Sequence, residues 1–145
     1  EFITRSGAAA KGSKFARKNE TNPSTVSVPT AMLDSLLARN KLQGPYVLKI
    51  DVEGAELEVL RGATQALAQT DAIIIETPIV VRMHGASSFG DIVTFLTQHE
   101  FALFDLAEIS YSTDTHFLNL ANGIFVKKDN AAWQRLSQPK TARNS

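Results

Sequence analysis

Two carboxylates, Asp51 and Glu53, stand where a short apolar run meets a glycine, Gly54. The run over residues 46–50 has the composition of a β-strand, and residues 55–69 take up the spacing of an amphipathic helix. Ligands of open parallel sheets bind beyond the carboxyl ends of the strands, and this turn is such an end. Asp51 and Glu53 are therefore the first candidates for catalytic chemistry.

The same two carboxylates also suit a purely structural role. Asp is a favoured helix N-cap, and Glu in a first turn interacts favourably with the positive end of the helix dipole. Turns that lead from a strand into a helix often end in such residues. The residue types at Asp51 and Glu53 thus leave both capping and chemistry open.

A third carboxylate, Glu76, lies near the end of residues 71–78, whose three consecutive isoleucines predict a central parallel strand covered on both faces. Glu76 either faces the same crevice as Asp51 or accepts a hydrogen bond from a loop N–H. We take Glu76 as a candidate for substrate binding, together with Arg82 in the following loop. His84 of that loop is a candidate general base, because a neutral imidazole titrates near the working pH.

Oxygen ligands from Asp51, Glu53 and Glu76 would also suit magnesium. Their spacing gives a metal site no independent support, so none is assigned. The chain has no cysteine, which excludes disulfides, thiolate nucleophiles and cysteine-ligated metals.

The strands and helices that must position these residues follow one another in an order that predicts an α/β domain. A short strand at 25–29 and a helix over 32–37, capped by Thr30, precede the strand at 46–50. The next predicted elements are, in order, one helix over 55–69, the strand at 71–78, a helix starting near Phe89, strands at 101–106 and 124–127, and a helix over 130–138 that docks through Trp133 and Leu136.

Alternation of strands and helices predicts that the strands at 46–50, 71–78 and 101–106 are parallel. Antiparallel pairing is open for the last strand at 124–127. The polar connection over 107–122 is either a hairpin or a functional loop.

Composition sets the outer limits. With 145 residues, 43% of them hydrophobic, the chain fits one globular domain over 26–138, with a flexible basic and polar segment at 1–25 and a tail at 139–145. Fifteen basic and fifteen acidic residues balance, which argues against nucleic acid or an acidic membrane as a partner. No apolar run suits a signal peptide or a membrane span, so we expect a cytoplasmic protein.

One long stretch carries a resemblance to a known family. Residues 48–63 (LKIDVEGAELEVLRGA), preceded by Val28-Pro29-Thr30 and Leu33-Asp34, resemble the hallmark of FkbM-type methyltransferases. Further positions stand in the order of that pattern, namely Ile75-Glu76, Gly85, Phe89, Phe95-Leu96, Phe101 and Ile124-Phe125-Val126. The similarity runs from about residue 26 to residue 128.

The resemblance implies a class I, S-adenosylmethionine-dependent O-methyltransferase with a Rossmann-like sheet whose last strand is antiparallel. Its substrate would be a small-molecule or carbohydrate acceptor, methylated on a hydroxyl of a sugar or natural product. The family's functional positions carry over to Asp51, which would also contact the cofactor, to Glu53 and to Glu76. A substrate hydroxyl would attack the sulfonium methyl, with Asp51 orienting it or accepting its proton.

The glycine-rich cofactor loop of such enzymes belongs upstream of residues 46–50, and Gly7 and Gly12 do not supply it. We therefore expect an incomplete sheet, corresponding to the carboxy-terminal half of the domain, with an exposed edge at 46–50. A missing amino-terminal half or self-association would complete it. The alternatives are a non-catalytic α/β binding or assembly module and, with less support, a receiver-like phosphoacceptor domain.

Overall fold

The computed structural model describes residues 2–6, 15–16, 25–52, 54–79 and 87–137, with side chains from Pro29 onward. The strands within these residues are β1 (Phe2–Ser6), β2 (Phe15–Ala16), β3 (Thr25–Pro29), β4 (Tyr46–Ile50), β5 (Thr70–Pro78), β6 (Phe101–Tyr111) and β7 (Leu118–Lys127). The helices are α1 (Leu33–Asn40), α2 (Glu56–Arg61), α3 (Thr64–Ala68), α4 (Phe89–Gln98) and α5 (Ala131–Ser137).

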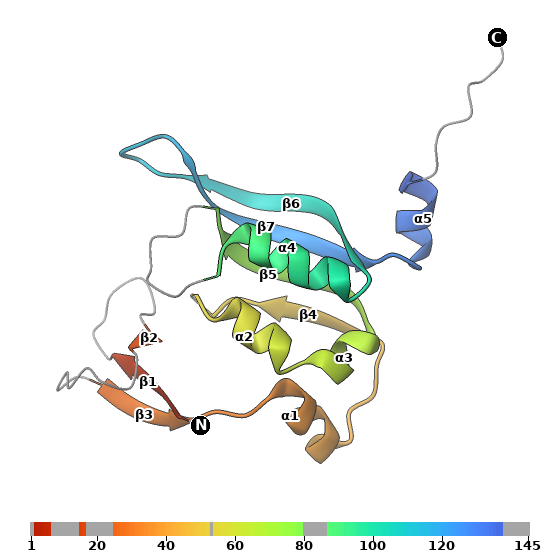
Figure 1. Cartoon of the computed structure of the whole chain (residues 1–145), viewed down its shortest axis with the longest axis horizontal. Helices are drawn as coiled ribbons and strands as arrows, with labels where there is room; N and C mark the ends of the chain where they lie inside the picture. The colour runs from red at the N-terminus through yellow and green to blue at the C-terminus, as the bar shows by residue number, and fades with distance from the viewer. Residues whose placement is uncertain (1, 7–14, 17–24, 53, 80–86, 138–145) are drawn as a thin grey trace, which may run out of the picture.

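Four strands form the main sheet in the order β4-β5-β7-β6 (Figure 1). β4 and β5 pair in parallel, whereas β7 is antiparallel to both of its neighbours, β5 and β6. β6 therefore runs in the same direction as β4 and β5. This confirms three strands of one direction and an antiparallel last strand, and it adds that the last strand inserts between β5 and β6.

β4 forms one edge of this sheet, as the sequence predicts, and Val47 on it is 68% exposed. The strands β1, β2 and β3 form a separate antiparallel sheet in the order β2-β1-β3. Both β1 and β2 fall within residues 1–25, where the sequence predicts a flexible basic and polar segment. Residues 1, 7–14 and 17–24 of that segment lie outside the described part of the chain.

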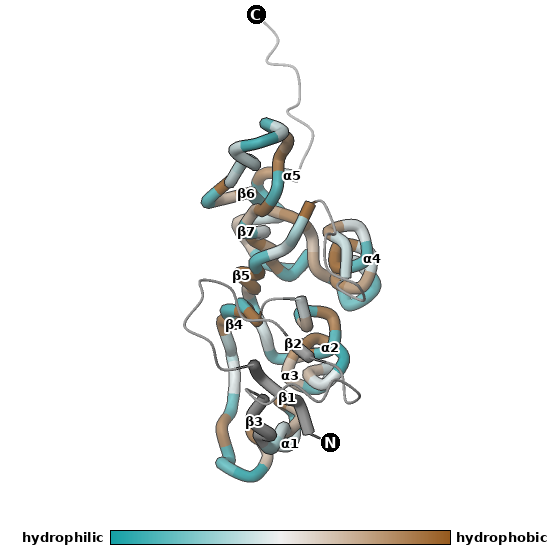
Figure 2. Tube along the Cα trace, turned by 90° about the vertical axis from the view of Figure 1, so that its left-hand side faces the viewer, coloured by the Kyte–Doolittle hydropathy of each residue, from teal (hydrophilic) through white to brown (hydrophobic). Residues whose placement is uncertain are grey.

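The core lies between one face of the main sheet and helices α2, α3 and α4, which stand on the same side of it (Figure 2). Ile73, Ile75 and Phe125 point to that side and are fully buried against Leu60 and Leu96 of the helices. Each such side chain contributes about 1.5–3 kcal/mol on burial. Because side chains alternate along a strand, Ile74 and Glu76 of β5 face the opposite side.

The single helix predicted over 55–69 is wrong, because the structure breaks it into α2 and α3 at Gly62 and Ala63. The reason is a tertiary contact. The Asp34 carboxylate accepts hydrogen bonds from the backbone N–H groups of Gln65 (3.0 Å) and Ala66 (2.8 Å), at the start of α3. Asp34 on α1 thus caps α3, whose own N-cap residue makes no side-chain cap bond.

The predicted Thr30 cap is also wrong, because α1 begins at Leu33 with Met32 in the N-cap position. No side chain caps this helix end. The backbone N–H of Asp34 donates instead to the carbonyl of Gly62 (3.1 Å), which ties the start of α1 to the turn after α2. That turn therefore satisfies a donor of α1 while Asp34 satisfies donors of α3.

The amphipathic helix predicted near Phe89 is confirmed as α4, whose Ile92 and Leu96 are buried. Ser88 and Asp91 form a capping box at its start. The connection over 107–122 is a hairpin, since β6 and β7 extend into it from both sides. The helix α5 is confirmed, but its predicted docking through Leu136 is wrong because that side chain is 69% exposed.

Replacing Asp34 by Ala removes the acceptor of two backbone N–H groups at the start of α3. We expect Asp34→Ala to lower the free energy of unfolding by about 1–2 kcal/mol, the cost of losing a helix cap. Urea denaturation followed by circular dichroism measures this as a lower midpoint at unchanged slope. Ser35→Ala, an exposed change on the same helix, is the control, and equal midpoints for the two variants would contradict this role of Asp34.

Candidate functional site

Asp51 follows the last residue of β4, at the carboxyl end of the parallel strands. Its carboxylate lies 3.0 Å from the ammonium of Lys49, two residues earlier on the same face of the strand. Both side chains are accessible, with 45% of Asp51 and 58% of Lys49 exposed. Solvent screens such a pair, so it orients the Asp51 carboxylate more than it stabilises the fold.

Asp51 also hydrogen-bonds the side chain of Glu76 on β5. The Lys49 ammonium foremost, and then Glu76, hold the pKa of Asp51 below its usual value of 3.8. Asp51 is therefore ionised at neutral pH. The pKa of Lys49 is correspondingly raised above 10.5, chiefly by its hydrogen bond to Asp51 and with smaller contributions from Glu76 and Glu108.

The strand register places polar residues of the other strands at this same end of the sheet. Glu76 stands opposite Asn122 of β7, and Asn122 stands opposite Ala107 of β6. The side-chain amide of Asn122 donates to the carboxylate of Glu108, at 2.6 Å. We call Asp51, Glu76, Asn122 and Glu108 the polar row. Asp51 directly follows β4, and the other three lie on β5, β7 and β6, at the same end of the sheet.

Glu108 reaches Asn122 because β6 is irregular there. The pairing with β7 shifts register between Ala107 and Ser110, and Glu108 has a left-handed backbone with φ of 48°. Bulges of this kind re-aim side chains, and a non-glycine residue in the left-handed region costs free energy that the surroundings must offset. The irregularity therefore brings the Glu108 carboxylate, the fourth member of the polar row, to this end of the sheet.

The turn after Asp51 has its own fixed geometry. Gly54 has a φ of 106°, a conformation that favours glycine, and its N–H donates to a carboxylate oxygen of Glu56 at 2.9 Å. Glu56 is only 2% exposed, and its second oxygen has no partner among the described residues. The glycine and the buried glutamate thus shape the turn that follows the strand.

The structure brings together two of the residues predicted for the site, Asp51 and Glu76. The other three, Glu53, His84 and Arg82, lie outside the described residues, so their roles stay predictions. Asn122 and Glu108 are not among the residues predicted from the sequence. Asn122 precedes a predicted strand and Glu108 lies in a polar connection, and no local pattern marks either of them.

No group of three or more His, Asp or Glu side chains within the described ranges has the geometry to hold a metal ion. The acidic members of the polar row are instead bonded to Lys49, to one another or to an amide. What the row offers to a ligand is therefore hydrogen-bond acceptors.

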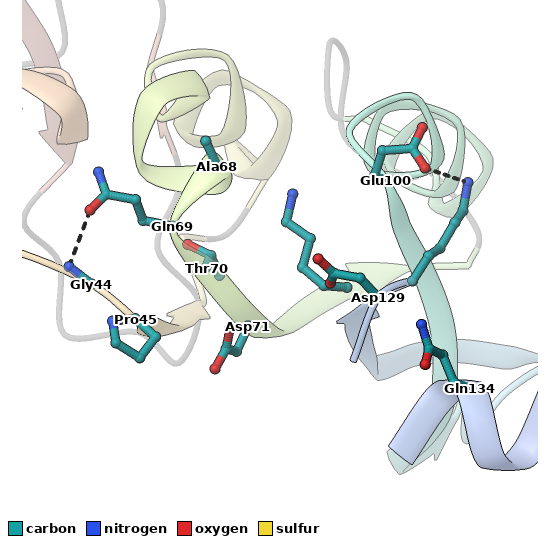
Figure 3. Close-up of a pocket in the computed structure, with 11 residues that line it drawn as sticks. Gly44, Pro45, Ala68, Gln69, Thr70, Asp71, Glu100, Asp129 and Gln134 are labelled. Atoms are coloured by element: carbon teal, nitrogen blue, oxygen red, sulfur yellow. Dashed lines mark hydrogen bonds and ion pairs between the residues drawn. The ribbon is translucent and has the colours of Figure 1, made fainter. Parts of the chain in front are cut away.

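A groove of about 750 Å³ lies at the other end of the sheet, between the starts of β4 and β5 and the segment that leads into α5 (Figure 3). Polar groups along it pair with one another: Gly44 donates to Gln69 at 3.3 Å, and Lys128 lies 3.5 Å from Glu100. A second hollow of about 700 Å³ lies beside β4, and its lining, most of it apolar, comes from β4, α1, α2 and the segments that flank the two helices. Neither hollow contains a member of the polar row.

The strand order, and the acidic residues at the carboxyl ends of β4 and β5, are consistent with an incomplete methyltransferase-like sheet. The protein-family model that describes the methyltransferase FkbM domain matches the sequence over residues 2–103. The chain therefore belongs to the FkbM methyltransferase family.

A curated relative, the hexuronic acid methyltransferase AglP of Haloferax volcanii, is 40% identical over 52 residues. That stretch covers 36% of this chain and 22% of the relative. No solved structure matches the chain at a significant level. Among the described residues, no helix has both the length and the apolar character needed to cross a membrane.

The ion pair with Lys49 predicts how Asp51 titrates. Lys49→Met removes the largest cause of the lowered pKa, so we expect the Asp51 pKa to rise toward 3.8. Carbon-detected NMR of the side-chain carboxyls measures this pKa directly, with the exposed Lys41→Met as control. An unchanged Asp51 pKa in Lys49→Met would contradict the assignment.

The same shift fixes the sign of a small stability effect. A carboxyl whose pKa is lowered by folding stabilises the folded state above its unfolded pKa, near 3.8, and this contribution disappears as pH falls through the lower folded value. Lys49→Met should therefore flatten the pH dependence of stability below about pH 4.

Proposed function

We propose that this chain forms part of an S-adenosylmethionine-dependent O-methyltransferase of the Rossmann-like class I fold, acting on a hydroxyl of a sugar or natural product. The observation that carries the proposal is the accessible carboxylate of Asp51 at the carboxyl end of β4, which lies 3.0 Å from the ammonium of Lys49 and beside Glu76 in the register of the parallel strand β5. Family membership supports methyl transfer. The relative from Haloferax volcanii, a hexuronic acid methyltransferase, supports a sugar as the acceptor.

Asp51 would act on the hydroxyl that receives the methyl group. Its carboxylate can accept a hydrogen bond from that O–H, hold the oxygen lone pair toward the methyl donor, and take up the proton as the new O–C bond forms. Lys49 limits the basicity of Asp51, because it lowers the pKa of that carboxyl. Orientation of the hydroxyl is thus the larger part of the proposed role, and Glu53 and His84 remain proposed alternatives for the base.

The acceptors of the polar row suit the cationic end of the proposed cofactor. S-adenosylmethionine would supply a methyl group activated by a positively charged sulfur. Asp51 and Glu76 could accept hydrogen bonds from its ammonium or ribose hydroxyls and would favour its positive charge. The described residues do not include a glycine-rich turn after a strand that would hold the adenosine, so this contact is assigned to no residue here.

Replacing the proposed orienting group tests the activity. We expect Asp51→Asn to reduce transfer of labelled methyl from S-adenosylmethionine to a sugar acceptor by about 10²- to 10⁴-fold, the usual contribution of a positioned acid–base group. The assay uses the intact protein that carries this chain and a panel of neutral and acidic sugars. Asp71→Asn makes the same chemical change at the amino end of β5 and serves as the control.

Two results would count against the proposal. Full activity in Asp51→Asn would remove Asp51 from the mechanism. Absence of both methyl transfer and S-adenosylmethionine binding in the wild-type protein, with concentration-dependent self-association, would favour the non-catalytic assembly module instead.

A further inference from the structure

Lys49 and Asp51 present a hydrogen-bond donor and an acceptor side by side on accessible surface. The Lys49 ammonium lies 3.0 Å from the Asp51 carboxylate, and 58% and 45% of the two side chains are exposed. An ammonium carries three N–H donors, and the contact with Asp51 uses one of them. A carboxylate likewise accepts more than one hydrogen bond. The pair can therefore bind, at one place, a group that donates and a group that accepts.

The pair is reached from the sheet face opposite the helices. Leu48 and Ile50, the neighbours of Lys49 on β4, pack into the core under the helices, so alternation along the strand directs Lys49 to the other side. Val47 on that side is 68% exposed, and α2, α3 and α4 all stand across the sheet from it (Figure 2). Lys49 also borders the second hollow beside β4. Space for the remainder of a ligand therefore adjoins the pair.

Two hydroxyls on adjacent carbons fit this donor and acceptor. In the gauche arrangement, their oxygens are separated by about the same distance as the Lys49 Nζ and Asp51 Oδ2 atoms. One hydroxyl can donate to Asp51 while the other accepts from Lys49, because every hydroxyl has one donor and two acceptor sites. An exposed ion pair contributes little to stability, so sharing it with a ligand costs little.

The charges around Lys49 favour such a diol over an anion. The carboxyls of Asp51, Glu76 and Glu108 all lie near enough to raise the pKa of Lys49. A carboxylate or phosphate of a ligand would be repelled by these negative charges, whereas neutral hydroxyls would not. The ammonium therefore suits a neutral acceptor oxygen.

Resting on the function proposed above, we infer that the acceptor substrate carries a vicinal diol, and that Lys49 binds the hydroxyl next to the one that is methylated. The methylated hydroxyl is the one that donates to Asp51. Lys49 is then a specificity-determining residue, because it selects acceptors with a hydroxyl on the carbon adjacent to the reacting one.

Ligand-observed NMR titration of the intact protein that carries this chain tests the inference without requiring turnover. Methyl 3-deoxyglucoside has no two hydroxyls on adjacent carbons. Methyl 6-deoxyglucoside also lacks one hydroxyl but keeps such pairs, and its ring and glycosidic oxygens are the same. We expect the wild type to bind methyl 6-deoxyglucoside about 10-fold more tightly, the lower end of what a hydrogen bond to a charged group contributes. Lys49→Met should bind the two sugars equally.

The preference between the two sugars, rather than the affinity for either, reports on Lys49. A substitution that only disturbed Asp51 would weaken both sugars alike and leave the preference intact. Lys49→Arg should keep part of the preference because it keeps a charged donor. Lys41→Met, at the exposed C-cap of α1, is the matched control and should keep all of it. Circular dichroism establishes that each variant is folded.

No sugar binding, equal binding of the two sugars by the wild type, or a preference that survives in Lys49→Met would each overturn the inference. The ribose of S-adenosylmethionine is also a vicinal diol. If Lys49→Met weakened binding of S-adenosylhomocysteine and left the sugar preference intact, the pair would belong to that ribose and the inference would be wrong.

The proposed function fails separately from this inference. A sugar preference that depends on Lys49, without any methyl transfer, would overturn only the proposed function. Methyl transfer that depends on Asp51 but ignores the adjacent hydroxyl would overturn only the inference.

Discussion

The antiparallel register of β7 between β5 and β6 is the constraint on which the site depends. It places Asn122 opposite Glu76 and, through the irregularity in β6, within reach of Glu108. A shift of one residue would turn Asn122 toward the helices and expose Phe125, whose burial holds the register in place. The packing of the apolar face thus determines which polar groups meet on the other face.

In the stretch that resembles the family hallmark, some residues hold the backbone in place, whereas Asp51 is available for chemistry. Gly54 and Glu56 form the turn after β4 through a hydrogen bond of 2.9 Å, and Asp34 closes the start of α3 from another helix. Asp51 is left accessible beside them. A long fixed motif is understandable on this basis, because most of its positions hold the backbone around one exposed carboxylate.

Much of the fold was predictable from local pattern. The apolar run before Asp51, the three isoleucines of β5 and the amphipathic spacing of α4 each indicate an element that the structure contains. The break between α2 and α3 was not predictable, because the group that caps α3 is Asp34, about thirty residues earlier in the chain. The exposure of Leu136 on α5 likewise depends on whether a neighbouring surface covers it.

The sequence by itself determined the order of strands and helices, the family resemblance and the candidacy of Asp51 and Glu76, since these follow from residue type and short-range spacing. Only the tertiary structure decided that Asn122 and Glu108 join them. Their separation in the chain hides their proximity, and a strained backbone in one strand together with the register of its neighbour creates it. Such long-range hydrogen bonds leave no periodic signal, so the far half of the polar row becomes visible only in the folded chain.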